Sequence, residues 1–303
     1  MIRIRIVFAL VAMTGVMGCA GVHSSLPRVS ETTRATYTNA EGARDFVLFR
    51  PASLPAKREE RALVVMLHGC TQSAEDMAKG TRMNAAATAG GFLVVYPEQT
   101  TAAHPQKCWN WYTPRQFTRD QGEAALLAGL IDSVARAEGV GAQRVSLVGM
   151  SAGAAMAANL GVAYPERYAA LAMHSGVPAL AATDVMGALT VMRQGVADDD
   201  ALGTRALAAM GARARPIPVL VLYGSADKVV SPTNLRATVR QWTVVNAGAP
   251  GRGAPVEEVM FDGLGHAWSG GSAEGTYTAP GGQDATGLIV AFLRRMGTID
   301  PRR

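Results

Sequence analysis

Short apolar runs alternate with helix-like segments along most of this chain, and this alternation limits the possible folds more than any other feature. Six continuous runs end at glycine, proline or a polar residue: DFVLFR at 45–50, RALVVMLHG at 61–69, GFLVVYP at 91–97, RVSLVGMS at 144–151, YAALAMHSG at 168–176 and PVLVLYG at 218–224. Helices are expected at about 75–89, 121–138, 152–164, 233–245 and 284–295. Continuous apolar runs are typical of strands buried on both faces. The pattern therefore predicts an α/β fold with a doubly wound, mostly parallel sheet and helices on both faces.

The chain is long enough for a full hydrophobic core, with 303 residues of which 49% are hydrophobic. No linker rich in proline, glycine or serine divides it, and no repeat is visible, so we expect one catalytic domain over residues 35–303. Two segments interrupt the alternation. Residues 97–120 form a long loop that carries two of the four tryptophans, and residues 178–216 are expected to form helices inserted before the run at 218–224. Long segments of this kind often carry function.

The first residues resemble an export signal. Arg3 and Arg5 precede an apolar run at 6–16, which is too short to cross a bilayer and about the length of a signal-peptide core. We therefore expect residues 1–18 to be a signal peptide and the protein to be exported. The polar, aperiodic residues 19–34 are expected to form a flexible tether.

The end of this signal segment allows two kinds of processing. Val16-Met17-Gly18-Cys19 resembles a bacterial lipobox, in which the cysteine is lipidated after cleavage before it. Ordinary cleavage after Gly18-Cys19-Ala20 is the alternative. The first predicts a periplasmic or outer-membrane lipoprotein, anchored to a membrane only through Cys19, and the second a secreted protein.

Both kinds of processing leave two cysteines, Cys70 and Cys108, available to pair with each other. In an oxidising compartment this favours a disulfide over two free thiols.

Removal of residues 1–18 takes away two arginines and no acids, which leaves 27 basic against 24 acidic side chains, a net charge of +3. No long basic block is interleaved with aromatic residues, so we expect no nucleic-acid partner.

A serine lies between two glycines where the run at 144–151 meets an alanine-rich segment. Gly149-Met150-Ser151-Ala152-Gly153 matches the G-x-S-x-G pattern of a nucleophile elbow, in which serine occupies a strained turn between a strand and a helix. The strand and helix can approach closely there because the flanking glycines have no side chain. The structural alternative is that Ser151 is an ordinary helix N-cap.

A serine nucleophile needs a histidine base and an orienting carboxylate. His266, in the loop FDGLGHAWSGG, follows the strand-like VEEVMF and fits the order Ser, Asp, His. An ordinary surface-loop histidine is the alternative. His174 is a poor candidate base, because Glu166 is the only acid between it and Ser151.

Asp227 is the expected acid. It follows PVLVLYGSA at the carboxyl end of a predicted strand, where open α/β sheets place their ligands. The alternatives are that it serves as a turn or N-cap residue, or that Asp262 is the acid instead.

Two backbone N–H groups are candidates for binding the oxyanion of an acyl-transfer reaction. Ala152 follows the nucleophile at a helix N-terminus. Cys70 follows the predicted strand in VVMLHGCTQ, where Gly69 allows a tight turn. His68 is expected to be structural, since no spaced His or Cys cluster supports a metal site.

Six motifs together resemble the poly(3-hydroxybutyrate) depolymerase family of esterases, which is related to feruloyl and acetylxylan esterases. The motifs are LHGCTQ, CWNWY, GMSAG, MHSGVP, YGSADKVV and GLGHAWSGG, and the resemblance covers about residues 35–297. It implies an α/β-hydrolase fold without a metal or organic cofactor. The roles that it implies are a Ser151, Asp227 and His266 triad, an oxyanion hole at Cys70 and Ala152, and a Cys70–Cys108 bridge.

The implied bridge would tie the oxyanion loop to the loop bearing Trp109, Trp111 and Tyr112. These aromatics are expected to wall the substrate pocket, with a core role as the alternative. Trp268, two residues after the expected base, is predicted to line the acyl or alcohol pocket.

The sequence thus predicts a serine carboxylesterase acting on small-molecule or oligomeric esters such as short hydroxyalkanoate oligomers. Depolymerases of this family that attack solid polymer usually add a C-terminal binding module, and none follows the last expected helix. We therefore expect soluble oligomers, short-chain esters or plant phenolic esters as substrates. A feruloyl or acetylxylan esterase, a serine peptidase or amidase, and a non-catalytic surface lipoprotein are the alternatives.

Overall fold

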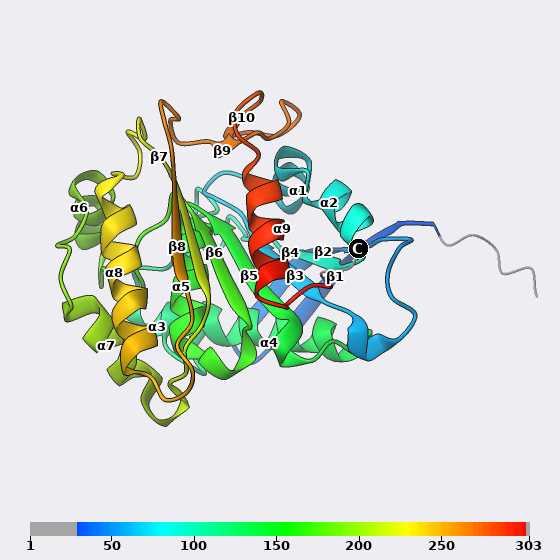
Figure 1. The fold of residues 1–303 in the computed structure, drawn as a ribbon, viewed down its shortest axis with the longest axis horizontal. Helices are drawn as coiled ribbons and strands as arrows, with labels where there is room; N and C mark the ends of the chain where they lie inside the picture. The colour runs from blue at the N-terminus through cyan, green and yellow to red at the C-terminus, as the bar shows by residue number, and fades with distance from the viewer. Residues whose placement is uncertain (1–28, 301–303) are drawn as a thin grey trace, which may run out of the picture.

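The computed structural model describes residues 29–300, and an eight-stranded sheet forms its centre (Figure 1). The strand order is β1-β2-β4-β3-β5-β6-β7-β8. The strands are β1 Glu31–Asn39, β2 Gly42–Arg50, β3 Leu63–Leu67, β4 Leu93–Pro97, β5 Val145–Met150, β6 Ala170–His174, β7 Val219–Gly224 and β8 Val256–Phe261. β1 pairs antiparallel with β2 and β2 with β4, whereas every pairing from β4 to β8 is parallel. The predicted mostly parallel sheet is confirmed.

Helices cover both faces of the sheet, as predicted. One face packs against α4 Gly122–Glu138, α5 Ala152–Ala163 and α8 Thr233–Gly248. On the same side, α3 Pro114–Phe117, α6 Val185–Gln194 and α7 Ala201–Met210 pack against these helices. The other face packs against α1 Ala74–Thr81, α2 Met83–Gly90 and α9 Ala285–Arg295. Short 3-10 turns lie at Arg58–Glu60, Ala142–Arg144, Pro165–Arg167 and Gly211–Arg213.

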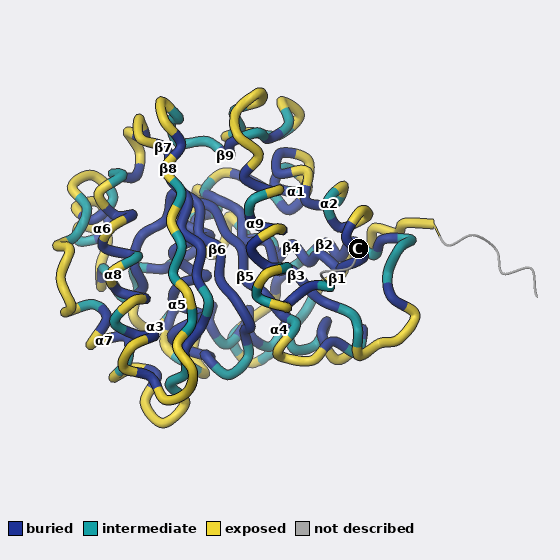
Figure 2. Tube along the Cα trace, in the orientation of Figure 1, coloured by how far each residue is buried: buried dark blue, intermediate teal, exposed yellow. Residues whose placement is uncertain are grey.

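Alternate residues of each central strand enter different cores. In β3, Val65 and Leu67 belong to the core under α4 and α5, while Val64 and Met66 belong to the core under α1 and α9. Successive side chains of a strand point to opposite faces, so a strand covered on both sides must be apolar throughout. This explains the continuous apolar runs of the sequence, and Figure 2 shows the central strands buried along their length.

The first strand corrects the predicted boundary of the tether. β1 begins at Glu31, four residues inside the segment 19–34 that was expected to be flexible. β1 escaped prediction because it is a mostly exposed edge strand of sequence ETTRATYTN, held mainly by its backbone ladder to β2, with Tyr37 alone packed against the core. The predicted signal peptide at 1–18, Cys19 and the tether as far as residue 28 lie outside the described residues.

Other elements match the predicted segments with small differences. The helix expected at 75–89 is two helices, because Arg82 adopts a left-handed conformation at φ 56° between α1 and α2. The insertion at 178–216 contains α6 and α7, as predicted. A small parallel pair, β9 Trp268–Ser269 and β10 Thr278–Ala279, was not predicted. Within residues 29–300 no helix is both long and apolar enough to cross a membrane.

The predicted functional residues follow neighbouring parallel strands. Cys70 follows β3, Ser151 follows β5, Asp227 follows β7 and His266 follows β8. Because the carboxyl ends of parallel strands meet at one edge of a sheet, these residues converge there.

Candidate active site

Ser151 occupies the strained turn that the sequence predicts. Its backbone lies at φ 55° and ψ −122°, between β5 and α5, and its side chain makes no N-cap hydrogen bond, so the N-cap alternative is wrong. A Cβ on Gly149 would lie 2.4 Å from the carbonyl carbon of Gly153, and one on Gly153 would lie 2.0 Å from the Leu67 oxygen. Only glycine fits at either position, because the backbones of β3, β5 and α5 already touch.

Asp227 and His266 form a close pair. His266 Nδ1 lies 2.7 Å from Asp227 Oδ2, and Asp227 Oδ1 accepts hydrogen bonds of 2.9 Å from the N–H groups of Val229 and Val230. With Nδ1–H donating to the carboxylate, His266 Nε2 keeps its lone pair. The rival acid Asp262 accepts instead from the Ser225 hydroxyl.

The environment keeps Asp227 ionised. Burial by itself would raise its pKa, but the hydrogen bond and charge of His266, together with the Val229 and Val230 N–H groups, outweigh this and hold the pKa below its ordinary value. A permanent carboxylate at this place fixes the imidazole in one tautomer.

Ser151 and His266 line one cavity of about 220 Å³. Its other lining residues are Gly69, Cys70, Thr71, Gln72, Gln106, Met150, Met192, Val229 and Tyr277. No hydrogen bond joins the Ser151 hydroxyl to the His266 ring in this structure. Catalytic hydrogen bonds of this kind are often long in a ligand-free site and tighten when substrate binds.

Two backbone N–H groups beside Ser151 are free to bind a ligand. Neither Cys70 N–H nor Ala152 N–H donates a hydrogen bond within residues 29–300. The Cys70 loop is held in place by its neighbours: Gly69 N–H donates to Gln72 Oε1 at 2.8 Å, and Thr71 N–H donates to the Gln106 carbonyl at 2.6 Å. Both N–H groups therefore have the fixed, unpaired character that an oxyanion site requires.

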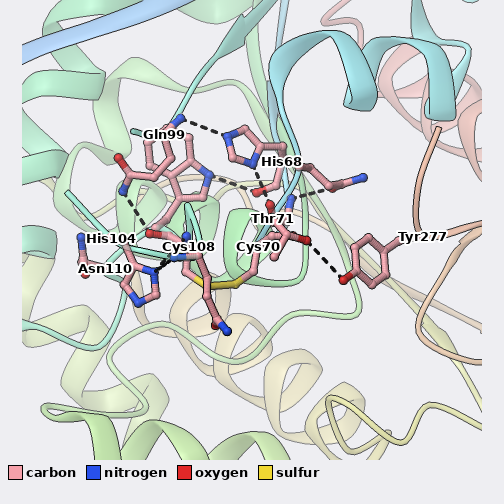
Figure 3. The surroundings of a disulfide bond; sticks show 12 residues. His68, Cys70, Thr71, Gln99, His104, Cys108, Asn110 and Tyr277 are labelled. Atoms are coloured by element: carbon pink, nitrogen blue, oxygen red, sulfur yellow. Dashed lines mark hydrogen bonds between the residues drawn. A yellow bond between two sulfur atoms is a disulfide. The ribbon is translucent and has the colours of Figure 1, made fainter. Parts of the chain in front are cut away.

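The predicted disulfide between Cys70 and Cys108 is present (Figure 3). Around it, buried Gln99 donates to the Cys108 carbonyl at 3.0 Å and to Glu123 at 2.5 Å. Glu123 also accepts from the Asn110 N–H at 2.8 Å. The bridge thus ties the Cys70 loop to a loop that is itself anchored on α4.

A second cavity, also of about 220 Å³, adjoins the first and shares Cys70, Gln106, Ser151 and Met192 with it. Its apolar lining consists of Trp111, Tyr112, Ala152, Ala155, Val177, Val185, Ala188, Leu189, Met192 and Val230. Trp111 and Tyr112 thus lie where the sequence analysis expected them, with their rings edge to face and 5.4 Å apart between centroids. His266 is not part of this lining.

Two predicted pocket residues are core residues instead. Trp109 is fully buried and donates from Nε1 to the His68 carbonyl at 3.0 Å. Trp268 is also buried, and it donates from Nε1 to Thr286 Oγ1 and stacks on the ring of His174. Neither lines either cavity, so both support the site from behind.

The two buried histidines near the site are neutral. His68 accepts from the Gln99 N–H at Nε2, its Nδ1 lies 2.7 Å from the Gly69 carbonyl, and burial lowers its pKa to about 4. His174 stacks between Phe261 and Trp268, and burial, followed by the charge of His266, lowers its pKa to about 3. His68 is structural, as predicted.

Sequence reasoning missed Thr71, Gln72 and Tyr277. Gln72 supports the Cys70 loop, while Thr71 and Tyr277 line the same cavity as His266. The available signal was weak: two glycine pairs, at 270–271 and 281–282, mark a tightly folded segment after His266 without indicating which residue faces the site.

Comparison with known proteins identifies the family. The family model described as Esterase PHB depolymerase matches residues 45–258, which is more than two thirds of the chain. The chain belongs to this family. The match includes Ser151 and Asp227, whereas His266 lies beyond its end.

Curated relatives of this esterase-family chain carry esterase names. It is 35% identical over 195 residues to poly(3-hydroxyalkanoate) depolymerase C of Paucimonas lemoignei, covering 64% of this chain and 46% of the relative. It is 27% identical over 208 residues to acetylxylan esterase A of Emericella nidulans, covering 66% of each. The chain thus spans about half to two thirds of the length of these relatives.

Solved structures show the same fold. The acetyl xylan esterase from Aspergillus awamori superposes with a TM-score of 0.66 at 20% identity, covering 78% of this chain and 94% of that one. Thermogutta terrifontis esterase 2, phosphorylated by paraoxon, gives 0.57 at 17% identity and covers 89% and 96%. The predicted α/β-hydrolase fold of this family member is confirmed.

Proposed function

We propose that this chain is a serine carboxylesterase with Ser151 as nucleophile, His266 as base and Asp227 as the orienting acid. The observation that carries the proposal is the Asp227–His266 pair, which faces the same cavity as a serine held in a strained elbow turn. The two unpaired N–H groups of Cys70 and Ala152 support it, as does membership of an esterase family.

The mechanism follows from these positions. His266 Nε2 takes the proton of the Ser151 hydroxyl while Ser151 Oγ attacks the ester carbonyl carbon. The carbonyl oxygen becomes an oxyanion, which the Cys70 and Ala152 N–H groups bind. The imidazolium, stabilised by Asp227, then gives its proton to the leaving alkoxide. Water enters, His266 deprotonates it, and its attack on the acyl-enzyme releases the acid and restores Ser151.

The need to protonate the leaving alcohol determines which cavity holds the alcohol and which holds the acyl chain. The leaving oxygen must come within hydrogen-bond reach of the base, so the alcohol occupies the cavity that His266 lines. The acyl chain then occupies the apolar cavity under Trp111 and α6. Each methylene that enters this cavity stabilises the complex by about 0.8 kcal/mol, or roughly fourfold in specificity.

Short hydroxyalkanoate oligomers and related short-chain esters are the substrates that we propose. The poly(3-hydroxyalkanoate) depolymerase name of the relative from Paucimonas lemoignei supports this class. Acetyl esters of sugars are the second candidate, because acetylxylan esterases are also among the relatives. An acetyl group would leave most of the apolar cavity empty.

Hydrolysis of para-nitrophenyl esters from acetate to octanoate tests the proposal. The wild type should cleave these esters, with kcat/KM rising from acetate to butyrate, and Ser151→Ala should be slower by several orders of magnitude. Equal rates for the two proteins would contradict the Ser151 assignment. A preference for acetate would favour the acetyl esterase, and faster cleavage of a matched para-nitroanilide would favour an amidase. An inert, folded wild type would favour a binding protein.

We further propose that the protein is exported, with residues 1–18 as signal peptide, Cys19 as lipidation site and the folded body starting near residue 31. The Cys70–Cys108 bridge supports an oxidising compartment. In a bacterial host, the full chain should fractionate with membranes and its Cys19→Ala variant should not. Equal soluble release of both would favour ordinary cleavage instead.

A further inference from the structure

The His266 side of the cavity has a polar wall that the proposed mechanism does not use. It consists of Tyr277 and Thr71, whose hydroxyl oxygens lie 3.2 Å apart (Figure 3). Both line the cavity with Ser151 and His266, and the Tyr277 ring meets the His266 ring edge on, with 6.3 Å between centroids. The lining also contains the apolar side chains of Met150, Met192 and Val229 and the amides of Gln72 and Gln106.

The backbone holds this wall in an unfavourable conformation. Tyr277 lies at φ 51° and Thr71 at φ 65°, in the left-handed region that bulky and β-branched residues rarely adopt. Such a conformation costs about 1–3 kcal/mol and persists only where surrounding contacts impose it. The Tyr277 carbonyl accepts from the Trp268 N–H at 2.7 Å, which pins the residue between β9 and β10.

Neighbouring contacts join this wall to the oxyanion loop. Asp76 accepts from both the N–H and the hydroxyl of Thr276, at 2.9 and 2.5 Å. Gln72, whose Oε1 holds the Gly69 N–H, donates from Nε2 to Asp76 and to the Thr276 carbonyl. The segment that carries Tyr277 is therefore positioned by the same side chains that position the Cys70 loop.

The hydrogen bonds that the two hydroxyls already make determine whether they can donate to a ligand or accept from it. Thr71 Oγ1 donates its only proton to the Cys70 carbonyl at 2.6 Å. The contact between the two hydroxyls therefore requires Tyr277 to donate to Thr71. With both protons committed, the Tyr277 oxygen has only acceptor capacity left, so the wall is matched to a ligand that donates a hydrogen bond.

We propose that Tyr277 and Thr71 form a subsite for the leaving alcohol that selects alcohols bearing a second hydroxyl group near the ester oxygen. The inference rests on the proposed esterase function, which assigns the alcohol to the cavity that His266 lines. Of the two proposed substrate classes it favours esters of sugars, because the leaving alcohol of a hydroxyalkanoate oligomer carries a carboxyl or ester group and no second hydroxyl. Tyr277 and Thr71 are both exposed in the free protein. A second hydroxyl on the alcohol donates to the Tyr277 oxygen, whereas an alkyl group of the same size displaces water from that oxygen without replacing its hydrogen bond.

The test is a competition between 2-hydroxyethyl butyrate and propyl butyrate, which share the acyl group and differ by one hydroxyl in place of a methyl. With both esters in one reaction, the ratio of the products gives the ratio of kcat/KM. In Tyr277→Phe this ratio should fall about fivefold from its wild-type value, as expected for one lost hydrogen bond. Differences in chemical reactivity between the two esters affect the ratio equally in both proteins, so they cancel when the ratio in Tyr277→Phe is divided by the ratio in the wild type.

Tyr37→Phe is the matched control, because it removes a phenol hydroxyl from β1 at the far edge of the sheet and should leave the ratio at the wild-type value. An unchanged ratio in Tyr277→Phe would overturn the inference, including the case in which both esters slow by the same factor, since Tyr277 would then only position its surroundings.

A binding measurement separates this inference from the proposed function. If no ester is cleaved by the wild type, the esterase proposal fails, and an NMR titration of Ser151→Ala with each ester still tests the subsite. The Ser151→Ala protein should then bind 2-hydroxyethyl butyrate more tightly relative to propyl butyrate than Ser151→Ala/Tyr277→Phe does. Equal relative affinities in the two proteins would overturn the subsite.

Discussion

At the scale of single residues, three positions proposed to act on substrate share a strained backbone. Ser151, Thr71 and Tyr277 all have positive φ, and each is held by contacts made elsewhere. Strain of this kind fixes a side chain in a geometry that a relaxed turn would not maintain, and it reduces stability.

Replacing Ser151 with glycine tests this strain. Glycine adopts φ 55° and ψ −122° without steric cost, although it loses more backbone entropy on folding. We expect Ser151→Gly to be more stable than Ser151→Ala by about 1–2 kcal/mol, since alanine keeps the strain. Urea unfolding of the two variants measures the difference, and equal stability would show that the turn is not strained.

The residues that the sequence predicted well are those whose position follows from the chain itself. A residue directly after a parallel strand must lie at the carboxyl edge of the sheet, which places Cys70, Ser151 and Asp227. Trp109 takes the core role that the sequence analysis gave as the alternative, and Trp268 was predicted wrongly, because closeness in sequence to a site residue does not determine which way a side chain points. Tyr277 was missed because its position depends on a folded loop with no regular period.

At the scale of elements, the loop at 97–120 is joined to the sheet edge by the Cys70–Cys108 bridge. The bridge spans 38 residues and includes the residue whose N–H is proposed to bind the oxyanion. It therefore bears both on stability and on the geometry of the site.

Removing the bridge should affect both properties. Closing a loop of 38 residues stabilises a protein by about 4 kcal/mol through the entropy of the unfolded chain, so Cys70→Ala/Cys108→Ala should lose about that much free energy of unfolding. Its kcat should fall about tenfold or more, because the Cys70 N–H is no longer held beside Ser151. Wild type treated with reductant should behave likewise. Full kcat in the variant would show that the loop keeps its geometry without the bridge.

The elements themselves were mostly predictable, because central strands are apolar on both faces and helices are bounded by turns. One exception, β1, is exposed over most of its length, with only Tyr37 and Asn39 half-buried, and is defined by pairing with β2. A hydrophobic pattern cannot reveal a strand whose stabilisation is mainly a backbone ladder. The break at Arg82 was equally hidden, since nothing in TRMN marks a left-handed residue.

At the scale of the whole molecule, two buried neutral histidines make stability depend on pH. His68 and His174 have pKa values lowered by burial to about 4 and about 3, whereas an unfolded histidine titrates near 6.5. Between pH 6.5 and 4 the unfolded chain binds protons that the folded protein excludes. Stability therefore falls as pH falls through this window, by about 1.4 kcal/mol per pH unit for each histidine.

Denaturant unfolding at pH 7, 6 and 5 measures this dependence. Asp227, whose pKa is lowered in the folded protein, loses its contribution only as pH falls below about 4, so it does not enter the window. The His174→Asn substitution changes the free energy of unfolding at pH 7 by some amount. The free energy of unfolding of this variant should nevertheless depend less steeply on pH than that of the wild type. An equal slope in the two proteins would show that folding does not lower the pKa of His174.

The central claim is that Ser151 is a nucleophile activated by His266. The most direct measurement is peptide mass spectrometry after treatment with a fluorophosphonate, which phosphonylates an activated serine whatever the enzyme's natural substrate. We predict one phosphonyl adduct, on the peptide that contains Ser151, and almost none in His266→Ala. An unlabelled wild type, an adduct on another residue, or full labelling without His266 would contradict the claim.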